Sequence, residues 1–326
     1  MAGGHSVIAG NVDHLIRSEV WSNELKEVLQ EQLEGTNYVK WLADFPGGSS
    51  TLTIPSISGS TVRNYQEDTA VVYDALDTGE FQFQIDQYLS SATYITNKAK
   101  QDVFYANELI AKFVPAQQRA IMEHVEAKIF GLQGQQTLAN ANTINGAKHR
   151  FRGGNASITS QLGIGDFSYA KYALKKANVP MTNLVALVPP EVEYLIENQN
   201  LNVNTSYNQM WEPLIETGAT TGTRFIRNIM GFDVYVSNHL ADITSEALQV
   251  AASTSSAPVT NGKASMFFSA DQSVLPFVGA WAQMPKVDSE YNKDYQRDEF
   301  VTTARYGVKL YRPENLVVCV HSVALS

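Results

Sequence analysis

At 326 residues, the chain is long enough for one large domain or for about two or three smaller ones, and a hydrophobic content of 44% is ordinary for a folded protein. The net charge of −9 argues against a protein that binds nucleic acid over its whole surface, and the single Cys319, between valines, indicates a buried side chain and excludes an intrachain disulfide. The start of the chain has no basic segment, and no run of about 18 apolar residues occurs, so we expect neither a signal peptide nor a membrane span.

Residues 1–45 are expected to form an N-terminal arm and a first helix. The beginning of this segment is rich in glycine and shows little periodicity, which indicates an extended arm. Ser22 or Asn23 can cap the helix that follows, in which leucines recur at helical spacing up to a stop signal at Gly35.

Residues 46–97 are expected to form a long two-stranded excursion and a return strand. Proline and glycine punctuate short alternating runs, and Phe81, Phe83 and Ile85 alternate with polar residues as in a half-buried strand. Two arms of about 15 residues would reach roughly 50 Å, and an isolated hairpin of that length is marginal in water. We therefore expect the hairpin to lie on its own core or on another subunit.

This hairpin is strongly acidic. Its charge fits either a solvated face or an acidic arm that docks on a basic surface of a partner. Arg63 is its only basic residue, against Glu67, Asp68, Asp74, Asp77, Glu80 and Asp86.

Residues 98–155 are expected to form a spine helix and a connector. Apolar residues recur at three- and four-residue steps between Asp102 and Leu132, which predicts an amphipathic helix roughly 45 Å long. Asp102 is placed to cap its first turn, Gly131 to end it, and Pro115 is expected to kink it. The predicted apolar face consists of Val103, Ala106, Ile110, Phe113, Ile121, Val125 and Ile129.

The connector leads into basic residues around Phe151. We expect these residues on a solvated loop, with a nucleic acid contact as the alternative because an aromatic is interleaved. They are Lys148, His149, Arg150 and Arg152.

Residues 156–286 are expected to form an α/β unit. Asp166 can cap a helix, and the apolar run from Leu184 to Val188 is typical of a buried strand. Residues 200–222 predict a long loop, which contains Trp211, and loops of this length usually bind a ligand or contact a partner. Further on, we expect a strand pair around Met230-Gly231, a low-complexity surface loop at 251–263, and an edge strand at Pro276.

Residues 287–326 are expected to form a terminal β ribbon beside the spine helix. The pattern places Arg305 and Lys309 on one face and predicts a turn at 312–315, followed by an apolar strand. The opposite, apolar face consists of Phe300, Thr302, Ala304, Tyr306, Val308 and Leu310.

The sequence offers no recognisable catalytic or metal-binding pattern. The six histidines lack metal-ligand spacing, and His124, between Glu123 and Glu126, is interpreted as part of a surface cluster. Nucleophile-elbow, phosphate-loop and dinucleotide-binding motifs do not occur. We therefore predict no catalytic residue, cofactor or metal site, and no enzyme.

The order of these parts resembles the major capsid protein of tailed bacteriophages, which has the Hong Kong 97 type fold, an α+β fold. TIPSISGSTVRNYQ through FQIDQYLSSATYITNKAKQD is similar to that family's E-loop returning into the spine. RNIMGFDVYVSNHL is similar to the strand pair after the axial loop of its A-domain, and FVTTARYGVKLYRPENLVV to the closing ribbon of its P-domain.

The resemblance implies a structural subunit that self-assembles into pentamers and hexamers of an icosahedral shell enclosing double-stranded DNA, without sequence-specific binding. It places the axial loop at 200–222 and the spine helix, connector and terminal ribbon in the P-domain. It suggests contacts between subunits in which acids of the E-loop meet cations of a neighbouring P-domain. The candidate contact residues are Asp68, Asp74, Asp77, Glu80, Lys286, Lys293, Arg297, Arg305, Arg312 and Trp211.

Two departures from the family pattern carry further expectations. Some members crosslink subunits through an E-loop lysine, but there is no lysine between Leu42 and Asn97, so we expect no crosslink. Some members carry a cleaved N-terminal scaffold, for which this arm is too short, so we expect a separate scaffolding protein. A portal and a decoration protein would be further partners of a virion capsid assembled in the host cytoplasm. The alternatives are the shell of a cellular nanocompartment and an unrelated soluble enzyme or binding module.

Overall fold

A computed structural model describes residues 33–42, 51–57, 62–64, 67, 68, 70, 78–102, 106–136, 143–154, 161–195, 225–251, 253, 254 and 256–323. The chain divides into two units, Met1–Gln32 and Leu33–Ser326, and every described residue belongs to the second. The predicted arm and the body of the first helix therefore lie outside the described residues. Gly35, the expected end of that helix, instead begins a short 3₁₀ helix, η2 (Gly35–Tyr38).

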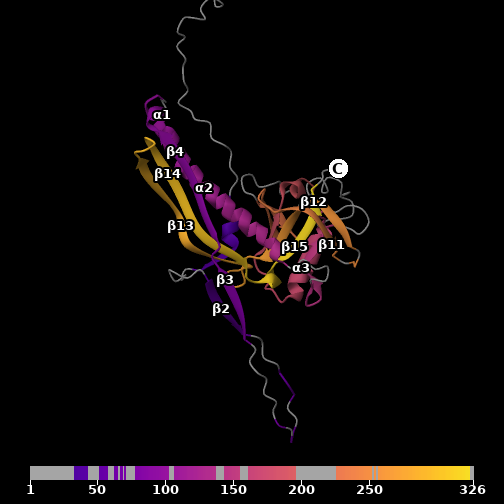
Figure 1. The fold of residues 1–326 in the computed structure, drawn as a ribbon. Coiled ribbons are helices and arrows are strands. Elements are labelled where there is room, and N and C mark those ends of the chain that lie inside the picture. The colour runs from indigo at the N-terminus through magenta and orange to yellow at the C-terminus, as the bar shows by residue number, and fades with distance from the viewer. Residues whose placement is uncertain are drawn as a thin grey trace, which may run out of the picture. The chain divides into compact units, whose positions relative to one another are not determined.

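The first of two main sheets has the strand order β1-β13-β14-β4. Its β1 runs parallel to β13, and the other pairs are antiparallel. The long helix α2 packs against β4, β13 and β14 (Figure 1). The elements are β1 (Val39–Leu42), β4 (Gln87–Thr96), β13 (Phe277–Asn292), β14 (Arg297–Leu310), α1 (Asn97–Asp102) and α2 (Ala106–Gly131).

The spine helix differs from the prediction at its start. Asp102 is the last residue of α1, not the cap of α2, whereas the predicted end at Gly131 is confirmed. Pro115 lies inside α2, and the kink stays a prediction. Val125 is fully buried, but Phe113 is 45% exposed, contrary to the prediction. A periodic stripe predicts which side of a helix is apolar, but not how much of that side a neighbouring element covers.

The second sheet has the strand order β7-β15-β12-β8-β10-β9, with β11 paired to β12. Apolar residues alternate between its two faces, as Val317 and Val318 do on β15, and each face is covered by one helix. The elements are β7 (Arg150–Arg152), β8 (Leu184–Val188), β9 (Phe225–Ile229), β10 (Phe232–Val236), β11 (Asp242–Gln249), β12 (Ser256–Ser269), β15 (Val317–Ser322) and α3 (Ile164–Lys176).

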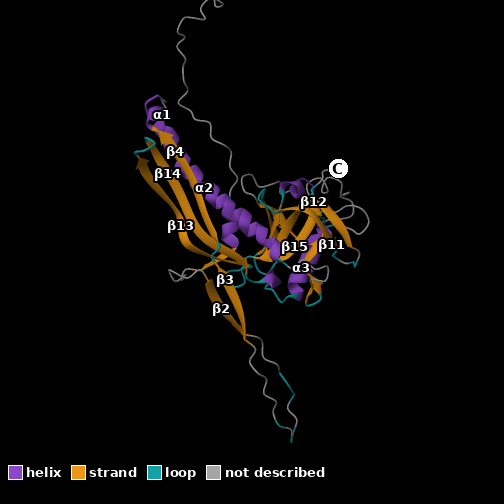
Figure 2. Ribbon diagram, in the orientation of Figure 1, coloured by secondary structure: helices purple, strands orange, loops and turns teal. Residues whose placement is uncertain are grey.

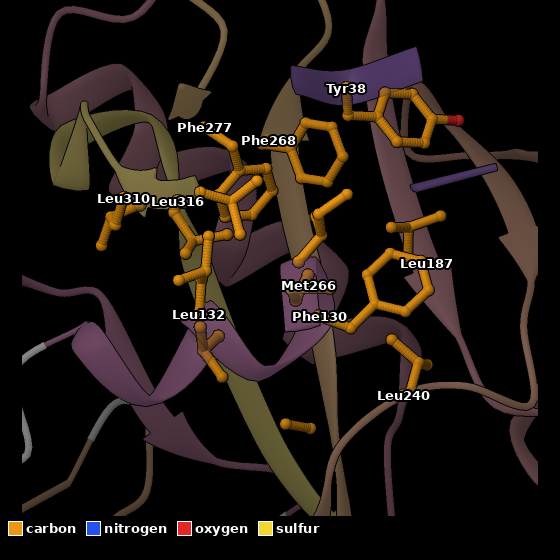
Figure 3. Close-up of a cluster of buried hydrophobic side chains, with 14 of the residues drawn as sticks. Tyr38, Phe130, Leu132, Leu187, Leu240, Met266, Phe268, Phe277, Leu310 and Leu316 are labelled. Carbon is orange, nitrogen blue, oxygen red and sulfur yellow. The ribbon is translucent and has the colours of Figure 1, made fainter. Parts of the chain in front are cut away.

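The main core joins the two sheets through the C-terminal half of α2. Phe130 of α2 packs with Met266 and Phe268 of β12 and with Tyr38, which precedes β1 (Figure 3). Tyr306 of β14 belongs to the same cluster. On the other face of the second sheet, α3 forms a separate core with β8, β10 and β12. Figure 2 shows the resulting mixture of helices and strands, and the predicted α+β class is confirmed.

Three local predictions are wrong. The basic group is not a solvated loop, because Arg150 and Arg152 lie in the buried strand β7. Most of the expected loop 251–263 is strand, since β12 begins at Ser256. Pro276 does not mark an edge, because it precedes β13, which is paired on both sides. In each case a partner distant in the chain supplies the pairing, and local composition does not reveal it.

Several other predictions are confirmed. The apolar run Leu184–Val188 is a fully buried strand, and Met230-Gly231 forms the turn between β9 and β10. The cap expected at Asp166 differs in position, because α3 begins at Ile164 with Gly163 as its N-cap, and the Asp166 carboxylate accepts from the Gly163 backbone N–H from inside the first turn. The buried face of β14 includes Thr302, Ala304, Tyr306, Val308 and Leu310, as predicted.

Smaller elements complete the described chain. They are η3 (Leu132–Gln135), η5 (Pro313–Asn315) and two hairpins, β2 (Thr51–Ile57) with β3 (Thr78–Gln84), and β5 (Thr143–Ile144) with β6 (Ala147–Lys148). None of the described helices combines the length and the apolar character that a membrane crossing requires.

Candidate subunit interfaces

The root of the β2–β3 hairpin, residues 81–85, is fastened to the first sheet. Phe83 is fully buried and packs with Val278 and Ala280 of β13 in a small separate core. The next alternating residue, Ile85, is 4% exposed and belongs to the same cluster. Phe81, Phe83 and Ile85 therefore alternate with polar residues because their side chains point to the one side of the root that packs against β13.

A second layer of contacts holds the edge of this root. The Lys309 ammonium group donates to the Gln82 carbonyl oxygen at 2.9 Å and lies 5.0 Å from the centre of the Phe81 ring. The Phe81 ring meets Tyr311 edge to face, with 5.0 Å between ring centres. The hairpin therefore leaves the sheet from a well-ordered base.

Gly307 of β14 permits the close approach of the root. A Cβ atom there would lie 2.6 Å from the carbonyl oxygen of Gln84 and 2.9 Å from the Cα atom of Ile85. Both are backbone atoms, which cannot rotate away as the end of a side chain can. The residue type at 307 therefore sets how closely the hairpin can join the sheet.

Beyond the root, the described part of the hairpin exposes polar side chains. Glu80 of β3 is exposed and lies opposite Pro55 of β2. Asp68 is exposed in a turn, with a φ of 61°. Asp74 and Asp77 lie outside the described residues, as does Trp211 with the whole segment 200–222.

The first sheet presents a second candidate surface on the side opposite α2. Thr302 donates to Gln117 of α2, so the residues alternating with Thr302 point to the other side. Tyr88 is 66% exposed and Tyr94 58% exposed there, and within the described ranges no element covers them. We call this surface the outer sheet face, and its residues are Tyr88, Ser90, Ala92, Tyr94, Lys286, Asp288, Glu299, Val301, Thr303 and Arg305.

Two of the candidate cations already have acidic partners within the chain. The Arg297 guanidinium is 2.6 Å from the Glu299 carboxylate, and the Lys286 ammonium is 2.7 Å from Asp288. The hydrogen bond from Arg297 lowers the pKa of the Glu299 carboxyl group. The Arg297 guanidinium also lies 4.4 Å from the ring centre of Tyr94. These contacts leave Arg297 and Lys286 less available to a neighbour.

The other three candidate cations remain available. Lys293, Arg305 and Arg312 are exposed, and none of them pairs with an acidic group in the described part of the chain. Arg305 lies on the outer sheet face beside Tyr88, and Lys293 lies in the turn between β13 and β14. Arg312 lies beyond the end of β14, with its guanidinium 5.4 Å from the Tyr311 ring centre. The cations follow the length of the β13–β14 pair and do not form one cluster.

The structure also contains a buried carboxylate that the sequence interpretation misplaced. Glu126 is fully buried, not part of a surface cluster, and its Oε2 atom accepts hydrogen bonds from the backbone N–H groups of Glu34 at 2.8 Å and Gly35 at 3.3 Å. Burial raises the pKa of Glu126, and burial together with the charge of Glu126 raises the pKa of Glu34 to about 7. The partners are about 90 residues apart in sequence, so no local spacing could identify this contact.

The described residues hold no group of three or more His, Cys, Asp or Glu side chains that could bind a metal ion. The basic strand β7 is committed to the fold, since Arg150 donates to both carboxylate oxygens of Glu246, at 2.8 and 2.5 Å. The described chain thus offers two candidate surfaces for contacts between subunits, the β2–β3 hairpin and the uncovered part of the outer sheet face.

Comparison with known proteins gives a consistent result. A family model described as phage capsid protein matches residues 78–319. Among solved structures, a chain of Mycobacterium phage Che8 has a TM-score of 0.66 and 19% identity, with 94% of this chain and 97% of that chain covered. The capsid of cyanophage P-SCSP1u gives a TM-score of 0.70 and 14% identity, with 97% and 94% covered. The capsid of cyanophage Pam1 gives 0.65 and 14%, with 100% of both chains covered.

At these identities the likeness to solved structures establishes the fold alone. A search of curated proteins found no match.

Proposed function

The chain belongs to the phage capsid protein family, and we propose that copies of it assemble into the pentamers and hexamers of an icosahedral shell that encloses double-stranded DNA. The family is one of structural virion proteins, and the fold is of the Hong Kong 97 type. The observation that carries the proposal is the family match over 78–319, a range that includes β3 of the hairpin and the complete outer sheet face.

Assembly would bring the hairpin of one copy onto the outer sheet face of the next. The hairpin and the face are different patches of the same chain, so the contact is heterologous, and a heterologous contact closes into a ring when its rotation allows. Charge supports this pairing. The hairpin carries an acidic excess. Within the described structure, Arg305 on this face lacks an acidic partner, as do Lys293 and Arg312 at the two ends of the β13–β14 pair.

The DNA would be enclosed without sequence-specific contacts. A chain with a net charge of −9 cannot rely on strong phosphate binding over its whole surface. DNA packed inside a shell is held by confinement and by its counterions, so the shell needs only to tolerate it.

The expected domain limits and further partners remain part of the proposal. The limits are 1–45 for the arm and first helix, 46–97 for the E-loop, 98–155 for the spine, 156–286 for the A-domain, and 287–326 for the terminal ribbon. The strand β13 crosses the last of these limits, and β15 pairs within the second sheet. A separate scaffolding protein, a portal and a decoration protein would complete the assembly, and the assembly would take place in the host cytoplasm.

The decisive experiment measures the particle mass of the purified chain by light scattering, with negative-stain microscopy, in the presence and absence of a candidate scaffold. We expect shells, or rings of five or six copies. A chain that stays monomeric under all conditions would contradict the proposed assembly. Shells that carry protein cargo in place of DNA would favour the nanocompartment alternative.

A further inference from the structure

The basic residues of this acidic chain are unevenly distributed. Residues 127–190 contain seven of its 24 lysines and arginines but only one of its 33 aspartates and glutamates, Asp166. A segment of such charge in a chain with a net charge of −9 indicates a local contact with an anionic partner, provided that the charges reach the surface.

The structure separates the internal charges of this segment from the exposed ones. Arg150 and Arg152 are buried in β7, and the Lys148 ammonium donates to the carbonyl oxygens of Val250 and Ser253 at 2.9 and 2.6 Å. Asp166, the one acidic residue of the segment, is also used within the fold. Its carboxylate is buried and accepts hydrogen bonds from the backbone N–H groups of residues 154 and 163. These groups stabilise the fold.

The exposed positive charge is concentrated on the solvent-exposed side of α3. Lys175 and Lys176 are exposed and have no acidic partner in the described ranges. Lys171, one turn earlier, is half-buried and donates to the Met230 carbonyl oxygen at 2.8 Å. Tyr172 lies between them in sequence, is 46% exposed, and has the Lys176 ammonium 5.9 Å from its ring centre.

Neutral hydrogen-bonding groups surround these lysines. Asn145, in the turn between β5 and β6, donates to the Lys176 carbonyl oxygen at 2.8 Å, and Asn178 is exposed directly after the helix. Lysine, asparagine and tyrosine side chains are among the groups that contact phosphate oxygens and sugars in protein–DNA complexes.

We propose that Lys171, Tyr172, Lys175, Lys176, Asn145 and Asn178 form a surface that contacts the phosphate backbone of the enclosed DNA. This inference rests on the proposed function. It identifies the side of the subunit that faces the interior of the shell. The rest of the chain has a large acidic excess and would repel DNA, so a local basic surface would determine which side of the shell lies against it. The contact would be independent of DNA sequence, because it reads no base edges.

Lysines in the last turn of a helix also stabilise the helix dipole. That role does not involve DNA, and the two roles differ in their salt dependence. Each phosphate neutralised by a lysine adds about 0.9 to the slope of log affinity against log salt concentration.

The test compares two variants with the same loss of charge, using a short DNA duplex and purified subunits before shell assembly, so that the α3 surface is open to the added duplex. The variant Lys175→Gln/Lys176→Gln removes two charges from the α3 surface, and Lys40→Gln/Lys98→Gln removes two exposed lysines of β1 and α1. We expect the first variant to reduce the salt slope by about 2 and the second to leave it unchanged. An equal effect of both, no effect of either, or no DNA binding by the wild type would overturn the proposal.

A second readout uses the only native cysteine, which is fully buried and therefore provides an unreactive background. In Lys175→Cys shells, we expect a small maleimide to react several-fold more slowly when DNA fills the shell than when the shell is empty. Equal rates would contradict the contact. If wild-type subunits form no shells, the proposed function itself fails. If shells form but slope and rates do not change, this inference alone fails.

Discussion

At the scale of single residues, the Glu126 carboxylate is a buried acidic group that accepts two backbone hydrogen bonds. It lies near the C-terminal end of α2 and binds the first backbone N–H groups of η2, which has no side-chain cap of its own. A Cβ atom at Gly35 would lie 3.1 Å from the Cγ atom of Glu126, so the glycine allows this approach. The contact fastens the segment that leads into β1 to the spine helix.

The neighbouring Glu34 makes stability depend on pH. Its pKa rises from 4.5 to about 7 in the folded protein, because burial and the charge of Glu126 disfavour its ionised form. The stabilisation that the protonated group contributes is complete below about pH 4.5 and is lost as the pH rises through about 7. We expect Glu34→Gln, which stays neutral, to be about 1–2 kcal/mol more stable than the wild type at pH 8 and equally stable near pH 4.5.

Urea unfolding across this pH range measures the difference between the two proteins. Groups that do not interact with Glu34 titrate in both proteins and cancel in the comparison, whereas Glu126, which is coupled to Glu34, is part of the measured difference. A stability difference that does not change with pH would show that Glu34 keeps an ordinary pKa.

At the scale of elements, the root of the β2–β3 hairpin decides whether the hairpin is held in a defined position. Phe83 is buried against β13, Lys309 bonds the hairpin backbone, and Gly307 leaves room for it. A long hairpin is not stable by itself. The contacts of the root therefore hold the start of the hairpin in a defined position on the sheet.

We expect Gly307→Ala to destabilise the chain by about 1–3 kcal/mol and to impair assembly, because the added methyl group meets backbone atoms that cannot rotate away. The matched control is Gly131→Ala at the end of α2, where the backbone has a helical φ of −64° and no atom lies within 4 Å of the new methyl group. Thermal unfolding and particle mass provide the two readouts. Equal behaviour of both variants would mean that the root tolerates displacement.

At the scale of the whole molecule, function depends on contacts between copies. The hairpin and the outer sheet face occupy different parts of one chain, as a ring-forming contact requires. The charges of the hairpin are acidic, and the available cations lie along β13 and β14.

Charge reversal tests the pairing directly. We expect Asp74→Lys/Asp77→Lys, and separately Arg305→Glu, to block shell formation while the subunit stays folded, because like charges would face one another across the interface. The control is Lys40→Glu, an exposed site on β1 with the same charge change as Arg305→Glu. Particle mass and circular dichroism separate assembly from folding, and normal shells from the reversed variants would refute the pairing.

The absence of a lysine between Leu42 and Asn97 predicts shells without an E-loop lysine crosslink. A boiled and denatured particle sample should give a single band near the 35.9 kDa mass of the chain. A ladder of covalent multimers would contradict this expectation.

Local periodicity was sufficient to predict several elements. The alternation in β14, the apolar run of β8, the end of α2 at Gly131 and the turn at Met230-Gly231 were all predicted correctly. These features depend on residues close in sequence, since side-chain direction follows the local backbone period. The order of such elements was also sufficient to indicate the fold family.

Only the tertiary structure decided which polar groups are buried and which cations remain available. Sequence placed Arg150 on a loop and Glu126 on the surface, but Arg150 is paired with Glu246 and Glu126 with the backbone of Glu34. It grouped Lys286 and Arg297 with the available cations, although each has an acid within the chain. Burial and pairing are set by partners far away in sequence, and a local pattern contains no information about distant partners. The sequence by itself thus determined the elements with a clear local period and the acidity of the hairpin, and the tertiary structure decided which charges are left for a neighbour.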